Sequence, residues 1–272
     1  MIKDYINYIR NVQGYSEHTC EAYERDLSAF ARWAQAQLAN ARWSSITEHD
    51  IEQYICYLSK KGYKPTTTNR ALTAIKAIYR YWMRKGLITI SPAKGVMPRL
   101  EDKPLPKTIS EESIIAAYNA STGDCRIIIA LLYITGIRLG ELLGITWNDI
   151  NFLTGTIRIH GKGRKEREVY VPKGILFQLE EKRDNETTGT KIFSLNPRNV
   201  RRMIDAAFSS IADGVSPHVL RHTAATHWAM NGASNTTIAK ALGHSRIETS
   251  QKYINMSQMD VKPMMANNYM FH

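Results

Sequence analysis

The 272-residue chain has little of what several protein classes require. Its longest apolar run, IIIALLYI at residues 127–134, is too short to cross a bilayer. The N-terminal MIKDYINYIRN is charged where a signal peptide needs an apolar core. Cys20, Cys56 and Cys125 are too few and too far apart for a disulfide framework or a zinc pattern. We therefore expect a soluble, cytoplasmic protein without membrane contact, whose thiols are buried and reduced.

Acidic residues are also scarce, because 36 Lys and Arg stand against 25 Asp and Glu, for a net charge of +11. The surplus is +6 over residues 1–95 and +4 over residues 109–272, so both halves of the chain carry it. A long polyanion that both halves touch would account for this spread, and double-stranded DNA is the obvious candidate. Solubility alone is the alternative explanation.

The first 95 residues have the periodicity of α-helices, in four successive stretches. Ser16 is a typical N-cap, the Thr47-x-x-Asp50 pair is a variant of the capping box, and a helix beginning after Pro65 fits the fourth stretch. Gly62 and Gly86 are typical helix ends. We predict a small helical bundle of the SAM-like kind whose buried faces include Tyr23, Leu27, Phe30, Ala34, Leu72, Ile75, Ile78, Tyr79 and Trp82.

Basic side chains without matching acids lie on the polar faces of these helices, which favours contacts with DNA phosphates. The predicted contacts are Lys60, Lys61, Lys64, Arg70, Lys76 and Arg80.

The rest of the chain is predicted to be a second domain behind a linker. Four prolines between residues 91 and 107 exclude a helix there, so we place an extended linker at 96–108. Residues 109–272 have mostly helical patterns, interrupted by GTIRIHGKGRKEREVYVPKG, whose alternation around GKGRK predicts a β-hairpin. The expected fold is mainly α: a helical domain at 1–95 and a mixed, mostly helical domain at 109–272 with a small sheet.

Four separated stretches of the second domain carry polar side chains where a fold would prefer apolar ones. TGIRLGEL places Arg138 and Glu141 three residues apart, as on one helix face. GKGRKER presents Lys162 at the tip or rim of the hairpin, and SPHVLRHT puts His218 and Arg221 on one face behind Pro217. LGHSRIETSQKYI then brings His244 and Tyr253, nine residues apart.

This set of cations, imidazoles and a phenol suits phosphodiester chemistry without a metal. A phosphate under attack gains charge on its non-bridging oxygens, and guanidinium forks match that geometry. Lysine can protonate a leaving alkoxide, histidine can accept a proton, and tyrosine can form a covalent intermediate.

In these motifs the sequence resembles the tyrosine recombinases, the phage-integrase and Xer-type site-specific DNA recombinases. The resemblance covers nearly the whole chain and implies a core-binding domain, a linker and a catalytic domain. It identifies Tyr253 as the nucleophile that forms a 3′-phosphotyrosyl link, and Glu141 as a supporting acid. It implies that Arg138, Arg221 and His244 hold the phosphate, that Lys162 is the general acid and His218 the base, with no cofactor or metal.

The resemblance also implies partners: a DNA recombination site, and a homo-tetramer on two sites that is a monomer or dimer when free. A partner recombinase or accessory protein is possible within the family. The Met-rich tail after Ile254 is expected to dock on a neighbouring subunit, and the two domains to close on DNA as a C-shaped clamp.

Alternatives remain for several residues. Lys165 competes with Lys162 as the acid, and Tyr269 is a second C-terminal tyrosine without an LGH motif at the right spacing. His218 and His222 have the spacing of zinc ligands, but position 219 is Val, where a metalloprotease motif has Glu. His222 and His227 are therefore interpreted as structural, or as lying near the phosphate without acting on it. At the level of function, the alternatives are a type IB-like topoisomerase and a non-catalytic DNA-binding relative.

Overall fold

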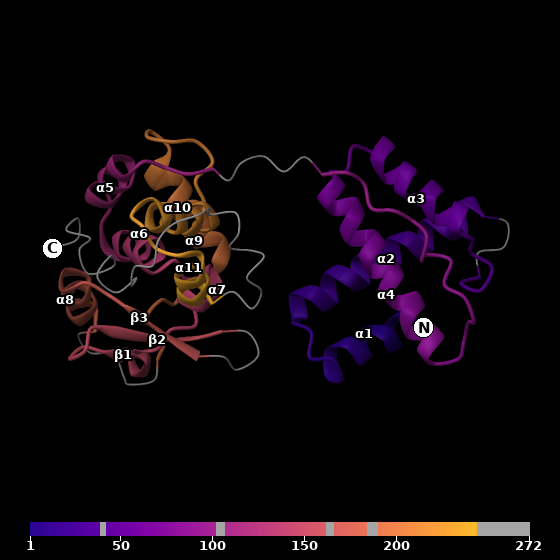
Figure 1. Ribbon diagram of the computed structural model, residues 1–272, viewed down its shortest axis with the longest axis horizontal. Coiled ribbons are helices and arrows are strands. Elements are labelled where there is room, and N and C mark those ends of the chain that lie inside the picture. Colours follow the sequence, from indigo (N-terminus) through magenta and orange to yellow (C-terminus); the bar gives the residue numbers. More distant parts are fainter. Residues whose placement is uncertain (39–41, 102–106, 162–165, 184–189, 244–272) are drawn as a thin grey trace. The chain divides into compact units, whose positions relative to one another are not determined.

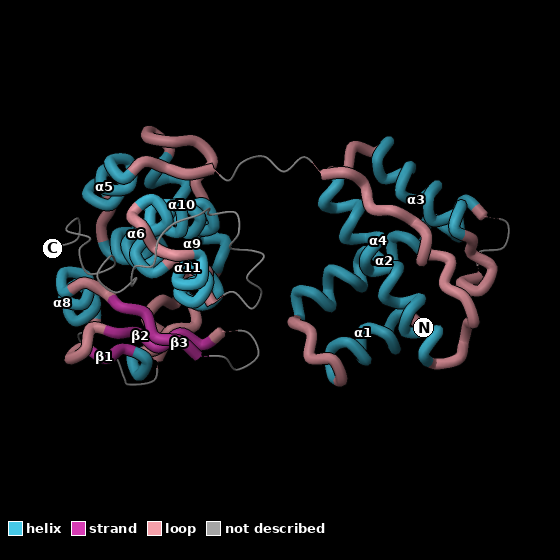
Figure 2. Tube along the Cα trace, in the orientation of Figure 1, coloured by secondary structure: helices cyan, strands magenta, loops and turns pink. Residues whose placement is uncertain are grey.

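The chain divides into two compact units, Met1–Pro104 and Leu105–His272, in the computed structural model shown in Figure 1. The structure describes all residues except 39–41, 102–106, 162–165, 184–189 and 244–272. Helices dominate both units, and one small sheet lies in the second (Figure 2). The predicted fold class is thereby confirmed.

The first unit is a helical bundle with an aromatic core. Phe30, Tyr54, Tyr79 and Trp82 are fully buried, and their rings lie against one another and against Trp43. Large rings remove much apolar surface from water, so their burial contributes strongly to the stability of the bundle. Its helices are α1 (Ile2–Asn11), α2 (Glu17–Gln37), α3 (Glu48–Lys60) and α4 (Pro65–Arg84).

The helix ends of the first unit lie where the cap residues predict them. Thr47 and Asp50 form the capping box of α3, with reciprocal bonds from each backbone N–H to the other side chain. Ser16 occupies the N-cap of α2, but its hydroxyl pairs with that of Thr19 instead of a backbone N–H. The helix α4 begins at Pro65 itself, one position earlier than predicted, because the fixed φ of proline suits the first turn.

The segment after α4 packs back onto the bundle as far as residue 101. Ala93 and Val96 belong to the buried core of the first unit. The Asn69 side chain accepts a hydrogen bond from the Arg99 backbone N–H at 2.8 Å and donates to the Arg99 carbonyl at 2.9 Å. The first part of the predicted linker is therefore fastened to α4, and the division between the units lies later, after residue 104.

The second unit is built around a buried helix. Every residue of α6 (Gly123–Thr135) from Ile127 onward is buried, because other helices contact it on several sides. A helical segment that is apolar on every side, such as the one from Ile127 to Ile134, is stable only when it is enclosed. The helices around it are α5 (Glu111–Ala120), α8 (Lys173–Lys182), α9 (Pro197–Phe208) and α10 (Pro217–Met230), while α7 (Leu139–Leu142) follows it and α11 (Asn235–Leu242) packs on α10.

The predicted hairpin is present as the centre of a three-stranded antiparallel sheet. Strand β2 (Thr156–His160) pairs with β3 (Glu166–Tyr170), with Ile157 opposite Val169 on the buried face. A short strand β1 (Ile150–Asn151) pairs with β2 on its other side. A strand of two residues is too short to show an alternating pattern of apolar and polar side chains, so the sequence did not predict β1.

The cysteines do not all follow the prediction. All three are free, and Cys20 is buried, but Cys56 is exposed on α3 and Cys125 is half-buried. Position 56 falls on the solvent side of α3 because Ile55 and Leu58 take the buried face. The prediction of buried thiols is therefore wrong for Cys56.

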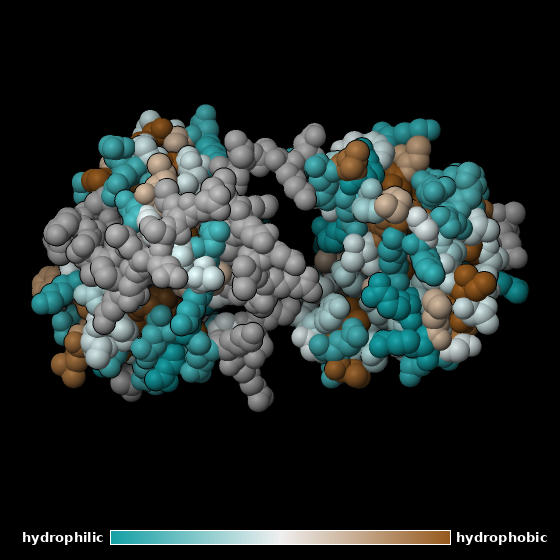
Figure 3. Space-filling model, viewed as in Figure 1, coloured by the Kyte–Doolittle hydropathy of each residue, from teal (hydrophilic) through white to brown (hydrophobic). Residues whose placement is uncertain are grey.

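The surface in view is mainly hydrophilic and carries separate hydrophobic patches (Figure 3). None of the helices within the described parts of the chain is long and apolar enough to span a membrane.

Candidate active site

The structure describes three of the six predicted catalytic residues, together with the supporting acid Glu141. Lys162, His244 and Tyr253 lie outside the described residues, as do the alternatives Lys165 and Tyr269.

Arg138 precedes a helix instead of lying on a helix face, which corrects the prediction. Gly136 has φ 59° and ends α6 in the left-handed conformation, so the chain turns before α7 begins at Leu139. The contact with Glu141 forms all the same: the Arg138 backbone N–H donates to Oε2 at 2.9 Å and Nη1 donates to Oε1 at 2.8 Å. The Arg138 side chain is 46% exposed, so its guanidinium also faces solvent.

Arg221 lies in the first turns of α10 and is only 5% exposed. The helix begins as predicted, with Pro217 as its first residue and the Ser216 hydroxyl accepting from the Val219 N–H. The Arg221 guanidinium donates to the carbonyl of Gly136 and, at 2.8 Å, to that of Leu242. Both acceptors are carbonyls at helix C-termini, which have no partner within their own helices.

His218 lies one turn before Arg221 and is surrounded by cationic and imidazole groups. Burial, and then the charges of Arg221 and Arg138, lower the pKa of His218. Its Nε2 lies 3.0 Å from Nε2 of His222, a distance at which one ring donates to the other. Such a bond needs at least one neutral imidazole, and it occupies the nitrogens that a shared zinc ion would need.

His227 has a structural partner, in agreement with the sequence interpretation. Its Nδ1 lies 2.8 Å from the hydroxyl of Tyr133 on the buried helix α6. Across the described part of the chain, no group of three or more His, Cys, Asp or Glu side chains is arranged to hold a metal ion.

Three arginines converge on the last carbonyls of α11. Arg167 donates to Ala241, Arg221 to Leu242, and Arg138 to Gly243, the last at 3.4 Å. Guanidiniums at a helix C-terminus satisfy its free carbonyls and complement its partial negative charge. These hydrogen bonds hold Leu242 and Gly243, the first two residues of the LGH motif, and His244 is the next residue in sequence.

Arg167 was not predicted as a site residue, although the sequence contained one signal for it. Strand alternation places it on the same face as the buried Val169, and an inward arginine needs a partner. Its Nη1 and Nη2 bind Oε1 and Oε2 of Glu141 at 3.2 Å and 2.9 Å, as a fork.

Glu141 is therefore a carboxylate held between two guanidiniums. Its side chain is 8% exposed, and burial alone would raise its pKa. Hydrogen bonds from Arg167 and from the backbone and side chain of Arg138 outweigh burial and lower the pKa of Glu141 to about 2. Glu141 is ionised at any physiological pH and neutralises part of the local positive charge.

One of the basic residues predicted to bind DNA has an acidic partner. Arg70 makes a two-pronged ion pair with Asp26 at 2.7 Å and 3.0 Å, and the Asp26 side chain is only 9% exposed. The prediction that this cluster lacks matching acids is wrong for Arg70, because the sequence does not reveal that α2 and α4 meet there. The other five have no ion pair with described residues: Lys60, Lys61, Lys64, Lys76 and Arg80.

A second basic face, on α9, was missed. Arg198, Arg201 and Arg202 are exposed, and their spacing places them on the solvent side of a helix whose buried side holds Val200 and Ile204. None of the three has an ion pair within the described residues. The i, i+3, i+4 spacing of these arginines could have predicted a basic helix face from the sequence.

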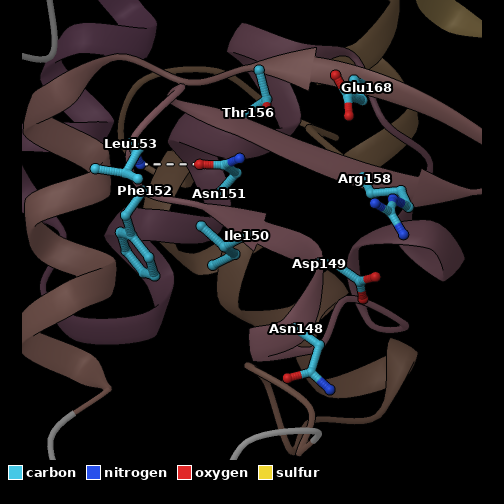
Figure 4. A pocket seen from close by; sticks show the side chains of 9 residues that line it. All are labelled: Asn148, Asp149, Ile150, Asn151, Phe152, Leu153, Thr156, Arg158 and Glu168. Carbon is cyan, nitrogen blue, oxygen red and sulfur yellow. Dashed lines mark hydrogen bonds between the residues drawn. The ribbon is translucent and has the colours of Figure 1, made fainter.

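A shallow pocket of about 340 Å³ lies over the sheet, away from the residues above. Figure 4 shows Arg158 and Glu168 on neighbouring strands at one end of it, and Asn151, Phe152 and Leu153 at the other. It contains none of the predicted catalytic side chains.

Comparison with known proteins identifies a family for both units of the chain. Residues 107–259 match the model of the Phage integrase family, and residues 2–86 match that of the phage integrase N-terminal SAM-like domain. The chain is 32% identical to the tyrosine recombinase XerC of Pelobacter propionicus, over 92% of this chain and 88% of that protein. It is 31% identical to the tyrosine recombinase XerD of Pseudomonas aeruginosa, over 94% and 93%.

Among solved structures, the fold is similar to that of the Tn1549 transposon integrase in complex with a circular intermediate DNA. The TM-score is 0.74 at 17% identity, and 97% of each chain is covered.

The chain therefore belongs to the phage integrase family. It is a tyrosine-type recombinase acting in site-specific DNA recombination, and the relatives give no support to the topoisomerase alternative.

Proposed function

We propose that this recombinase cuts and rejoins double-stranded DNA at a specific site through a 3′-phosphotyrosyl intermediate on Tyr253. The observation that carries the proposal is the convergence of Arg138 and Arg221 on the end of α11, one residue before His244. Two family motifs and the start of a third, separated by up to 105 positions in sequence, meet at this point.

In the proposed reaction, the Tyr253 oxygen attacks the scissile phosphorus and the bond from phosphorus to the 5′-oxygen breaks. His218 accepts the tyrosine proton, and Lys162 protonates the departing 5′-oxygen. Arg138, Arg221 and His244 hold the non-bridging oxygens, whose charge grows in the transition state. Attack by a 5′-hydroxyl reverses these steps and releases the tyrosine, so the bond energy is kept without ATP or a metal.

The environment of His218 supports its role as the proton acceptor. Its lowered pKa keeps the ring neutral near pH 7, and a neutral imidazole can accept a proton.

Two exposed basic faces support the proposed DNA contacts, one on each unit. In the first unit these are Lys60, Lys61, Lys64 and Arg80, with Lys76 half-buried, and in the second they are the arginines of α9. Phosphate contacts of this kind supply affinity that falls as salt rises. We propose that the units close on one half-site as a clamp and that four subunits assemble on two sites in the cytoplasm, with the C-terminal tail docking on a neighbour.

Covalent trapping tests the function. The full chain is incubated in EDTA with nicked DNA duplexes of randomised core, and a denaturation-resistant protein–DNA band is sought. We expect a band with wild type and with Tyr269→Phe, and none with Tyr253→Phe, because a phenylalanine has no oxygen to attack phosphorus. Sequencing the trapped DNA would identify the target.

Other results would contradict the proposal in different ways. Tight DNA binding without a covalent band in any variant would favour the non-catalytic relative. If the band were lost in Tyr269→Phe instead, Tyr269 would be the nucleophile.

A further inference from the structure

All three nitrogen atoms of the Arg167 guanidinium donate hydrogen bonds to other residues of the protein. Its Nε donates to the Ala241 carbonyl at 2.9 Å, while Nη1 and Nη2 form the fork with Glu141. The side chain is 14% exposed, compared with 46% for Arg138 on the other side of the same carboxylate. Arg138 is thus the guanidinium available to a phosphate, and Arg167 is the one that faces inward.

The space around Arg167 is tightly filled. Gly243 has φ 64°, and a Cβ built there would lie 2.9 Å from Nη1 of Arg167 and 3.2 Å from its Cζ. The guanidinium therefore packs directly against the backbone that ends α11. Only glycine suits both the backbone conformation and the contact.

Three separate elements meet at this one side chain. Arg167 belongs to β3, Glu141 belongs to α7 beside Arg138, and Ala241 belongs to the last turn of α11, which precedes His244 in sequence. A change in the position of Arg167 would alter the geometry of all three.

We propose that Arg167 is a positioning residue for DNA strand cleavage: it fixes the carboxylate of Glu141, and through Glu141 the guanidinium of Arg138, against the end of α11. The proposal rests on the proposed roles of Arg138 and Tyr253. Misplacing a group that stabilises a transition state slows the chemical step more than it weakens substrate binding.

The test compares cleavage rate with DNA affinity. The substrate is the nicked duplex selected by wild-type trapping, and covalent-complex formation is followed in a single turnover at saturating DNA. For Arg167→Gln we expect the rate to fall about 10- to 100-fold, with half-site affinity changed less than about threefold. The matched control is Arg158→Gln, an arginine on the neighbouring strand whose side chain lies on the exposed face of the sheet, and it should keep the wild-type rate.

A second pair of variants examines the route through Glu141. If Arg167 acts through that carboxylate, the double variant Arg167→Gln/Glu141→Gln should be no slower than Glu141→Gln alone, because coupled residues are not additive. Arg167→Lys retains the charge without the fork, so it also should be slow, and it serves if Arg167→Gln does not fold.

A wild-type rate in Arg167→Gln or Arg167→Lys would overturn the proposal. So would a double variant whose defect is the product of the single ones, since Arg167 would then act independently of Glu141. Absence of any wild-type covalent complex would instead refute the proposed function.

Discussion

His218 illustrates how the surroundings of a single residue set its chemistry. Arg138, Arg221 and His222 all lie close to it, and no acidic group contacts it within the described residues. Protonation would therefore add a positive charge to an already cationic site. The ring is kept neutral by its neighbours as well as by its burial.

The cleavage rate should consequently have an acidic limb set by His218. Because its pKa is lowered from 6.5, the neutral base persists at pH 6.5 and is lost as the pH falls below that value. The rate of covalent-complex formation, measured from pH 5 to pH 8, should decline only on the acid side. His218→Gln should be slow throughout and lack this limb, whereas an unchanged limb would assign it to another group.

The same shift affects stability with a defined sign. The unfolded chain binds the proton of His218 at a higher pH than the folded chain does. The free energy of unfolding therefore falls as the pH decreases through 6.5.

Residue types and motif order predicted Arg138, Glu141, His218 and Arg221, since each has chemistry that a motif records. They did not predict the role of Arg167. Alternation indicates only that Arg167 points inward, and its partners come from α7 and α11, 26 and 74 positions away. Only the folded chain brings these three segments together.

At the scale of elements, the Arg70–Asp26 pair joins α4 to α2 across 44 positions of sequence. Asp26 is buried, so its charge depends on this partner. Removal of one member of a largely buried pair leaves the other without compensation.

Arg70→Ala should therefore destabilise the first unit by about 1–3 kcal/mol, below the range for a fully buried pair because Arg70 is partly exposed. Urea unfolding followed by tryptophan fluorescence measures this change. Arg80→Ala, on the same helix without a partner among described residues, should change stability by less than about 0.5 kcal/mol. Equal stability losses in the two variants would show that the ion pair contributes nothing.

Helices were the elements that the sequence predicted best, because their periodicity and caps are local. Thr47, Asp50 and Pro217 mark helix ends that the structure confirms. The arrangement near Arg138 was harder, since its spacing to Glu141 fits both a helix face and an N-cap. The left-handed conformation of Gly136 decides in favour of the N-cap, and the spacing of residues in the sequence does not reveal a backbone φ angle.

For the molecule as a whole, the connection between the units is fastened at both ends. Asn69 holds Arg99 and also donates to Glu101 at 2.8 Å. In the second unit, the Ile109 N–H donates to the Thr223 hydroxyl on α10 at 3.2 Å. The predicted linker 96–108 is thus longer than the part that lies between these fastenings.

Loss of the Asn69 side chain should release residues 97–101 from the bundle. Limited trypsin digestion with mass spectrometry should show faster cleavage after Arg99 in Asn69→Ala and in Asn69→Asp, which cannot donate to the Arg99 carbonyl. Thr73→Ala, one turn further along α4, should match the wild type. Unaltered cleavage in both Asn69 variants would mean that other contacts hold the segment.

Fastening the connection at both ends has a consequence for affinity. The eight peptide units between Glu101 and Ile109 reach at most about 29 Å, so the unit that has not yet bound is confined to that distance from the one that has. A short tether gives a local concentration on the order of millimolar, far above that of free protein. The two proposed DNA-binding faces can therefore act together as one stronger ligand, and Asn69 keeps the tether short.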